Sequence, residues 1–162
     1  MPELARSVRA WGPIALVVLV VDQLTKTWAL EALDDRNIDL FWTLRLNLAF
    51  NTGMAFGSGE GWGPIIGIVG LVVVVALILS LRSTPGKWSN LAVGMIVGGA
   101  LGNLADRLFR SPGWLRGAVV DFIDFQWWPI FNVADMGIVL GGLLLVGLSW
   151  HQPRARPEPA DA

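Results

Sequence analysis

Residues 12–31 read GPIALVVLVVDQLTKTWALE, an apolar run of the length that crosses a bilayer, whose hydrocarbon core of about 30 Å takes roughly 20 helical residues. Asp22 and Lys26 interrupt this run four positions apart, so they share one face of a helix. An Asp at the middle of a bilayer costs about 2.5–3.5 kcal/mol on insertion scales. The run is too long and too polar for a cleaved secretory signal, and we interpret it as a retained transmembrane helix.

Three further apolar runs, at 63–82, 90–108 and 130–150, have a similar length. The 162-residue chain is 54% hydrophobic and only 15% charged, whereas a soluble domain carries about 25% charged residues. These observations predict an all-α membrane protein, a four-transmembrane-helix bundle that forms a single domain over 1–151. The Pro-rich polar tail 152–162 is expected to be disordered and cytoplasmic.

The basic residues near the two termini and in the short segment after the second span lie on one side of the expected spans. They are Arg6, Arg9, Arg82, Lys87, Arg154 and Arg156. Arg36, Arg45, Arg107, Arg110 and Arg116 lie on the other side, spread over longer segments. Cytoplasmic segments carry an excess of Lys and Arg, so we expect both termini in the cytoplasm and the segments 32–62 and 109–131 outside. Within the first outer segment, Ile38 to Phe56 alternates partly between apolar and polar residues, which predicts a short β-hairpin or small extracytoplasmic sheet.

Most of the costly polar residues lie at the outer ends of the spans. They are Asp22 and Lys26 in the first span, Asn103, Asp106 and Arg107 at the end of the third, Asn132 and Asp135 at the start of the fourth, and Asn51 and Asp121 in the outer segments. The apolar run after Asp135 holds only about fifteen residues, too few to cross alone, so the helix must include the turn that carries Asn132 and Asp135. We therefore expect one polar site near the outer leaflet.

Composition excludes several kinds of site. There is no Cys, and the single His, His151, follows the last span. Thiol nucleophiles, structural zinc sites and a Ser-His-Asp triad therefore lack their residues. The net charge of −1 gives no basic surface for nucleic acid. We expect no metal, no cofactor and no nucleic-acid partner.

Two close carboxylates in a medium of low dielectric constant cannot both ionise easily, so one of them keeps a proton. The ionised group can then take a proton from water that attacks a peptide carbonyl, while the protonated group polarises that carbonyl and protonates the leaving amine. Asp121 and Asp135 suit these roles, because apolar residues flank each of them in the sequence. The expected site can therefore hydrolyse a peptide bond without a metal ion.

Each polar residue also has a purely structural interpretation. Asp22 and Lys26 can pair with each other, Asp106 and Arg107 can form an ion pair or end a helix, Asn51 and Asn132 can cap turns or helices, Asn103 can hydrogen-bond between helices, and Arg45 can be a solvated strand residue. These interpretations explain single residues, but not why all of the residues converge at one leaflet.

Other functions use similar residues. Carboxylates within a membrane also serve proton-coupled carriers and channels, although such relays need polar groups through the full depth of the bilayer. A non-catalytic assembly factor would use the same groups only to hold the bundle together. A Ser/Lys protease would pair Lys26 with Ser58 or Ser111, and neither serine lies in a motif.

Five motifs make the chain resemble the lipoprotein signal peptidase (signal peptidase II) family. They are DQLTK at 22–26, NTGMAFG at 51–57, GGALGNLADR at 98–107, VVDFID at 119–124 and FNVAD at 131–135. The motifs occur in the order typical of the family and extend from the first span to the last. The segment 108–118 is longer than is usual between the third and fourth motifs.

The resemblance implies an aspartic endopeptidase of the bacterial cytoplasmic membrane that removes the signal peptide from prolipoproteins, cutting before a diacylglyceryl-modified cysteine. It implies that Asp121 and Asp135 form the catalytic dyad. Supporting residues would be Asp22, Lys26, Asn51, Asn103, Asp106, Arg107 and Asn132. The expected partners are lipid-modified prolipoproteins and membrane lipids. We expect a monomer, although the sequence leaves the oligomeric state open.

Overall fold

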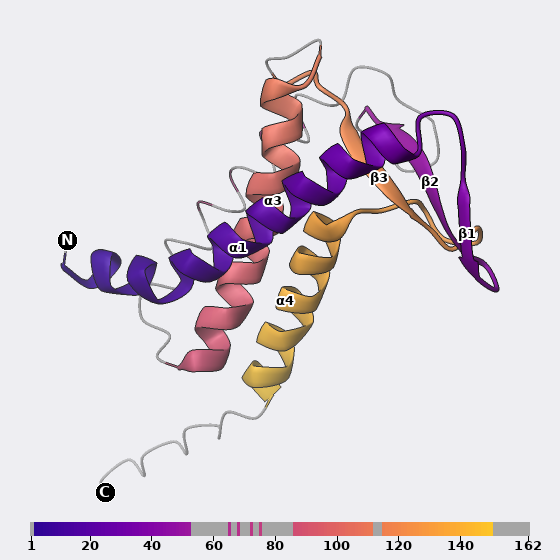
Figure 1. Cartoon of the computed structure of the whole chain (residues 1–162). Coiled ribbons are helices and arrows are strands. Elements are labelled where there is room, and N and C mark those ends of the chain that lie inside the picture. The colour runs from indigo at the N-terminus through magenta and orange to yellow at the C-terminus, as the bar shows by residue number, and fades with distance from the viewer. Residues whose placement is uncertain are drawn as a thin grey trace, which may run out of the picture.

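A computed structural model describes residues 2–52, 86–111 and 115–150, together with Ile65, Ile68, Val72 and Val75. Its elements are α1 (Pro2–Ala32), β1 (Ile38–Phe41), β2 (Leu44–Asn51), α3 (Lys87–Phe109), β3 (Val119–Asp124) and α4 (Val133–Trp150). The three helices cross one another as a bundle, and the strands form a small sheet where α1 and α3 end and α4 begins (Figure 1).

Three of the described helices are long and apolar enough to cross a membrane. They are Val8–Ala32, Lys87–Phe109 and Val133–Trp150. They correspond to the first, third and fourth expected spans, with ends shifted by a few residues. The expected span 63–82 lies outside the described residues apart from four of its positions, which are helical and about half exposed. The membrane fold with a small sheet is confirmed, and the count of four spans stays a prediction.

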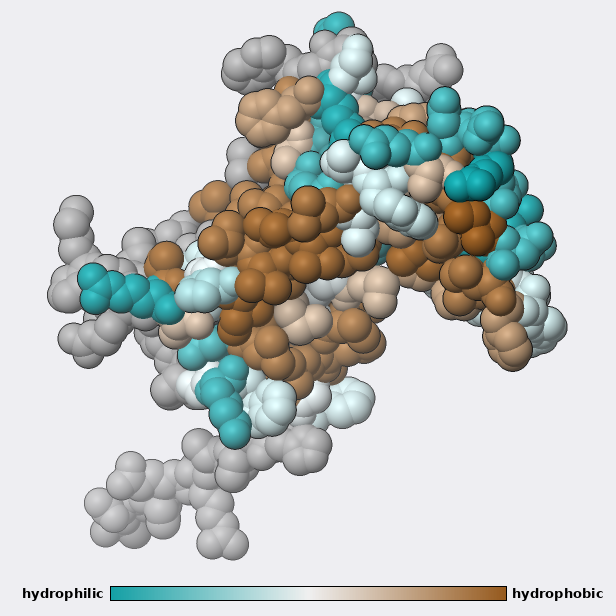
Figure 2. All heavy atoms as spheres, viewed as in Figure 1, coloured by the Kyte–Doolittle hydropathy of each residue, from teal (hydrophilic) through white to brown (hydrophobic). Residues whose placement is uncertain are grey.

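Helix α3 packs against both α1 and α4 through small residues. A Cβ atom added at Gly98 would lie 2.5 Å from the backbone oxygen of Ala15, and one added at Gly141 would lie 2.7 Å from that of Ala92. Such contacts are possible only because glycine lets two backbones approach closely, as is common between helices in lipid. Long apolar side chains such as Leu16 and Leu143 are instead more than half exposed. Figure 2 shows apolar side chains over the helices and many polar side chains over the sheet.

The sheet has the order β1-β2-β3, with both pairs of strands antiparallel. The predicted hairpin is present as β1 and β2, and its turn holds Trp42 at a φ of 51°. The third strand, β3, lies in the segment 109–131, for which the sequence predicted an outer position but no strand. Strand β3 forms because it pairs with β2, so that Asp121 lies opposite Ala49 and Asp124 lies opposite Arg45.

Candidate active site

The side chain of Lys26 lies at the centre of a buried polar network between α1 and α3. Its Nζ atom is 2.9 Å from Asp22 Oδ2, 2.9 Å from Asp106 Oδ2 and 2.9 Å from Asn103 Oδ1. The side chains of Lys26, Asp22 and Asp106 are fully buried. The structural interpretation of an Asp22–Lys26 pair is therefore correct but incomplete, because Asp106 and Asn103 complete the coordination of the ammonium group.

The two carboxylates of this network have further donors, which satisfy most of their acceptor sites. Asp22 Oδ1 accepts the backbone N–H of Ala134 at 2.9 Å, a bond that ties α1 to the first turn of α4. Asp106 accepts Arg110 Nε at 2.6 Å and the backbone N–H of Val120 at 3.1 Å, which ties α3 to β3. Gln23 Nε2 donates to both carboxylates. The network therefore connects α1 and α3 to the first turn of α4, which carries Asp135, and to β3, which carries Asp121.

Asn103 and Asn132 connect this network to Asp135. The amide nitrogen of Asn103 donates to Asp135 Oδ1 at 2.8 Å. Its amide oxygen accepts both Lys26 Nζ and Asn132 Nδ2, the latter at 3.1 Å. An ammonium group can only donate, so it requires the oxygen of Asn103 to face it and the NH₂ group to face Asp135.

Asn132 and Asp135 also cap the N-terminus of α4. The backbone N–H of Asp135 donates to Asn132 Oδ1 at 3.0 Å, and the backbone N–H of Asn132 donates to Asp135 Oδ2 at 3.2 Å. This exchange has the reciprocal form of a capping box. The cap that the sequence suggested for Asn132 is therefore present, and it holds Asp135 in place at the same time.

Asp121 lies on β3 and receives hydrogen bonds from two asparagines. Asn132 Nδ2 donates to its Oδ1 at 2.6 Å, and Asn51 Nδ2 donates to its Oδ2 at 3.2 Å. Burial, followed by the negative charge of Asp135, raises the pKa of Asp121 from 3.8 to about 7, against the opposing effect of these bonds. Asn132 thus contacts the carboxyl groups of both Asp121 and Asp135.

Arg107 is buried beside these groups and is only 6% exposed. Among the residues that the structure describes, its Nη1 atom has no hydrogen-bond partner. It lies close enough to Asp121, Asp106 and Asp135 to interact with their charges. The ion pair between Asp106 and Arg107 that the sequence left open is not present, because Asp106 pairs instead with Lys26 and Arg110. Both residues lie in the last turn of α3.

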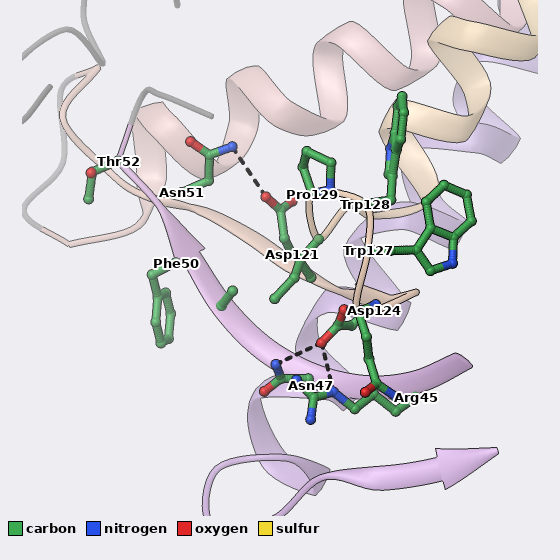
Figure 3. A pocket seen from close by; sticks show the side chains of 13 residues that line it. Arg45, Asn47, Phe50, Asn51, Thr52, Asp121, Asp124, Trp127, Trp128 and Pro129 are labelled. Atoms are coloured by element: carbon green, nitrogen blue, oxygen red, sulfur yellow. Dashed lines mark hydrogen bonds and ion pairs between the residues drawn. The ribbon is translucent and has the colours of Figure 1, made fainter. Parts of the chain in front are cut away.

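A cleft of about 650 Å³ opens over the sheet beside Asp121 (Figure 3). Its lining includes Asn51 and Asp121 at one end and Arg45, Asn47 and Asp124 at the other. Of the two aspartates, Asp121 lines this cleft and Asp135 does not.

Sequence analysis did not single out three residues of the polar networks, namely Gln23, Arg110 and Asp124. Gln23 lies within the DQLTK motif, and Asp124 ends the VVDFID motif, so their motifs could have indicated them. Arg110 had no such signal, because its partner Asp106 becomes evident only when α3 continues to Phe109. Within the described parts of the chain, no group of three His, Cys, Asp or Glu side chains is placed to hold a metal ion.

Apolar spanning helices with a buried cluster of carboxylates and amides at one end define the class of an integral membrane protein with a polar site. Comparison with known proteins identifies the family within that class. Residues 14–151 match the family model for signal peptidase (SPase) II. The chain belongs to the signal peptidase II family and is a protease of that type.

Individual relatives agree with this assignment. The lipoprotein signal peptidase of Mycobacterium leprae is 41% identical over 146 residues, which cover 89% of this chain and 73% of that protein. The lipoprotein signal peptidase of Rhodococcus jostii is 44% identical over 138 residues, which cover 84% and 70% of the two chains. A bacterial membrane enzyme solved by the in meso method at 1.9 Å resolution is 26% identical, with a TM-score of 0.73 over 92% of this chain and 95% of that one.

Proposed function

We propose that this protein removes the signal peptide from prolipoproteins, cutting immediately before the lipid-modified cysteine, with Asp121 and Asp135 as the catalytic carboxylates. The observation that supports this proposal most strongly is that Asn132 holds both carboxylates, through Asp121 Oδ1 at 2.6 Å and Asp135 Oδ2 at 3.2 Å. Relatives at 41% and 44% identity are named lipoprotein signal peptidases, which supports the same substrate class.

The surroundings of the two carboxylates differ. Asp135 accepts the amide N–H of Asn103 and the backbone N–H of Asn132 at the N-terminus of α4. The pKa of Asp121 is raised to about 7, by burial first and then by the charge of Asp135, so about half of the molecules carry a proton on Asp121 at neutral pH. We propose that the active form is the one in which Asp121 is protonated and Asp135 is ionised.

These charge states assign a role to each carboxylate. Asp135 takes a proton from the attacking water as the water oxygen bonds to the carbonyl carbon of the scissile peptide. Asp121 donates a hydrogen bond to the carbonyl oxygen and then gives its proton to the nitrogen as the carbon–nitrogen bond breaks. The products are the free signal peptide and a new amino terminus on the lipid-modified cysteine. Each proton that one carboxyl group accepts is balanced by one that the other donates.

The remaining polar residues of the five motifs then act as supports for this pair. Lys26 fixes the orientation of Asn103, and Asp22 and Asp106 compensate the charge of Lys26. Asn51 and Asn132 orient Asp121, and the buried guanidinium of Arg107 supplies positive charge near both aspartates. We propose that this site lies near the outer leaflet of the bacterial cytoplasmic membrane, with both termini in the cytoplasm, and that the protein acts as a monomer.

A carrier or channel has less support. Among the described residues, the buried charged side chains of α1 are Asp22 and Lys26, and those of α3 are Asp106 and Arg107. Each pair lies toward one end of its helix. A proton relay would need polar groups along the full depth of the bundle, and the described part of α4 beyond Asp135 contains only one further polar side chain, Ser149. The clustering therefore favours a site on one side of the membrane.

The test uses the purified full-length protein and a synthetic lipid-modified proprotein. Asp121→Asn and Asp135→Asn should each lower kcat/KM by at least about 100-fold, as expected when a general acid or base is lost. Asp35→Asn makes the same chemical change at an exposed position after α1 and serves as the matched control. Thermal unfolding in detergent shows whether each variant is folded. Folded variants at Asp121 or Asp135 with the activity of the control would refute the dyad.

A further inference from the structure

The cleft extends beyond Asp121 along β2. Arg45, Asn47, Ala49 and Asn51 all line it, although a register irregularity between Leu46 and Ala49 interrupts the regular alternation of side chains along the strand. Strand β2 is central in the sheet, with β1 on one side and β3 on the other. A bound peptide therefore has to lie across the face of the sheet, where these side chains can contact it.

The far end of the cleft is a charged cluster built around Asp124. This carboxylate accepts Arg45 Nε at 2.7 Å, Asn47 Nδ2 at 3.1 Å and the backbone N–H of Gln126 at 2.6 Å (Figure 3). Burial acts to raise the pKa of Asp124, but these hydrogen bonds outweigh it and the pKa is lowered. Asp124 is therefore ionised at neutral pH and holds Arg45 in place.

Arg45 presents the accessible charge of this cluster. Its side chain is 31% exposed, whereas that of Asp124 is 4% exposed. A guanidinium group has five N–H donors, and the hydrogen bond to Asp124 from Nε uses one of them. A side chain that enters this end of the cleft therefore meets a positively charged group with four further N–H donors on its two terminal nitrogens.

The register of the sheet sets the distance between this cluster and the proposed catalytic pair. Asp121 lies opposite Ala49, and Asp124 lies opposite Arg45. The two points are four residues apart along β2 and three apart along β3, because the register shifts between them. This separation corresponds to about 10–13 Å of extended chain, so an extended substrate that reaches both points places its third or fourth residue from the cut beside Arg45. The segment before the cut is the apolar signal peptide, which suits the bilayer better than a charged cluster. The segment after the cut is the one that fits.

We propose that Arg45, held by Asp124, forms a specificity subsite that favours an acidic side chain at the third or fourth residue after the cut and disfavours a basic one. The inference rests on the proposed cleavage of prolipoproteins. It assigns a substrate preference to residues that take no part in the chemistry. The proposal also gives related roles to two residues of β2. Asn51 orients Asp121 beside the scissile bond, and Arg45 contacts the chain that follows the cut.

The experiment compares cleavage of synthetic lipid-modified proproteins that differ at one residue. Glu, Gln or Lys is placed at the third or fourth residue after the cut, and in a second set at the tenth. The wild-type enzyme should cut the Glu substrate about two- to fivefold more efficiently than the Lys substrate, the range that partly exposed ion pairs give. At the tenth residue the ratio should be about one.

The enzyme variants test whether Arg45 causes the preference. Arg45→Glu should invert the Glu to Lys ratio, whereas Arg36→Glu makes the same charge change outside this cleft and should leave the ratio unchanged. If Arg45→Glu does not fold, the double variant Arg45→Gln with Asp124→Asn removes both charges, and its ratio should be about one.

Three results would overturn the subsite. The first is that the wild-type enzyme cuts the Glu and Lys substrates equally well whether the change is at the third or at the fourth residue. The second is a Glu to Lys ratio that is as large at the tenth residue as near the cut, and the third is a ratio that does not change in the Arg45 variants. Failure of the folded wild-type enzyme to cut any of the substrates would refute the proposed function itself, and the subsite with it.

Discussion

Asn132 and Asp135 exchange two hydrogen bonds across the first turn of α4, in which each residue donates its backbone N–H to the side chain of the other. The same Asn132 side chain donates to Asp121 at 2.6 Å. One residue therefore both starts the helix and connects the two aspartates. Because the oxygen of the amide serves the helix and its nitrogen serves Asp121, substitutions can separate the two effects.

Asn132→Ser should keep the helix cap and lose the hydrogen bonds that the amide nitrogen donates to Asp121 and Asn103. A serine hydroxyl accepts the N–H of Asp135 as asparagine does, so this variant should be more stable than Asn132→Ala, whereas its kcat/KM should fall at least about tenfold relative to the wild type. Asn132→Ala loses the cap as well and should cost about 0.5–2 kcal/mol of stability. Unfolding temperature and cleavage rate are measured on the same samples. A serine variant with full activity would show that the contact with Asp121 is dispensable.

The raised pKa of Asp121 predicts a limit to activity at alkaline pH. Protonated Asp121 is the proposed acid, and its pKa is about 7, so kcat/KM should fall as the pH rises above about 7. Asn51 donates to Asp121 and lowers that pKa. Asn51→Ala should therefore move the alkaline limit to higher pH. A rate that does not change between pH 6 and 9, or a limit that moves to lower pH in the variant, would contradict the assignment.

The same pKa predicts how Asp121 affects stability. Folded Asp121 keeps a proton up to about pH 7, whereas the unfolded chain releases it near 3.8. The contribution of this carboxyl group to stability is therefore fully present below about pH 3.8 and is lost as the pH rises to about 7, by an amount on the order of 4 kcal/mol. Asp121→Asn should gain stability relative to the wild type over this pH interval. If the difference in unfolding temperature between the two proteins stayed constant between pH 4 and 8, this prediction would be contradicted.

The sequence predicted the helices well because a spanning helix is a local feature. Length and hydropathy located three described spans to within a few residues. Strand β3 was missed because its partner β2 lies about 70 residues earlier in the chain, and VVDFID has no clear alternation of apolar and polar residues. A strand stabilised by a distant partner cannot be identified from its own periodicity.

The site was predictable as a set of residues but not as a set of contacts. The cost of burying charge in a bilayer indicated Asp22, Lys26 and Asp106 individually, and the expected topology indicated that they lie at one level. Which carboxylate pairs with which cation depends on the rotation of each helix about its axis. Asp106 therefore pairs with Lys26 and Arg110, and not with the adjacent Arg107.

Removal of the ammonium group of Lys26 should destabilise the bundle strongly. Lys26→Met leaves the fully buried carboxylates of Asp22 and Asp106 without their shared cation, a change that typically costs about 3–5 kcal/mol. Asp106 keeps its ion pair with Arg110, so the double variant that adds only Asp22→Asn removes the uncompensated charge and should recover part of that loss. Thermal unfolding in detergent measures both effects. If the double variant were less stable than Lys26→Met alone, the network would not owe its stability to charge compensation.

Two adjacent glycines of α4 provide a test of the helix packing. A Cβ atom at Gly141 would lie 2.7 Å from the backbone oxygen of Ala92 and 2.8 Å from Ile96 Cγ1, whereas one at Gly142 meets nothing within 4 Å. Gly141→Ala should force α4 away from α3 and lower the unfolding temperature, because the nearer contact is to backbone that cannot move aside. Gly142→Ala adds the same methyl group one position along and should be neutral or stabilising by up to about 1 kcal/mol, because alanine favours helix more than glycine does. Equal unfolding temperatures for the two variants would mean that α3 and α4 do not pack as closely as described. Because α4 carries Asp135 at its first turn, Gly141→Ala should also lower kcat/KM, and Gly142→Ala should not.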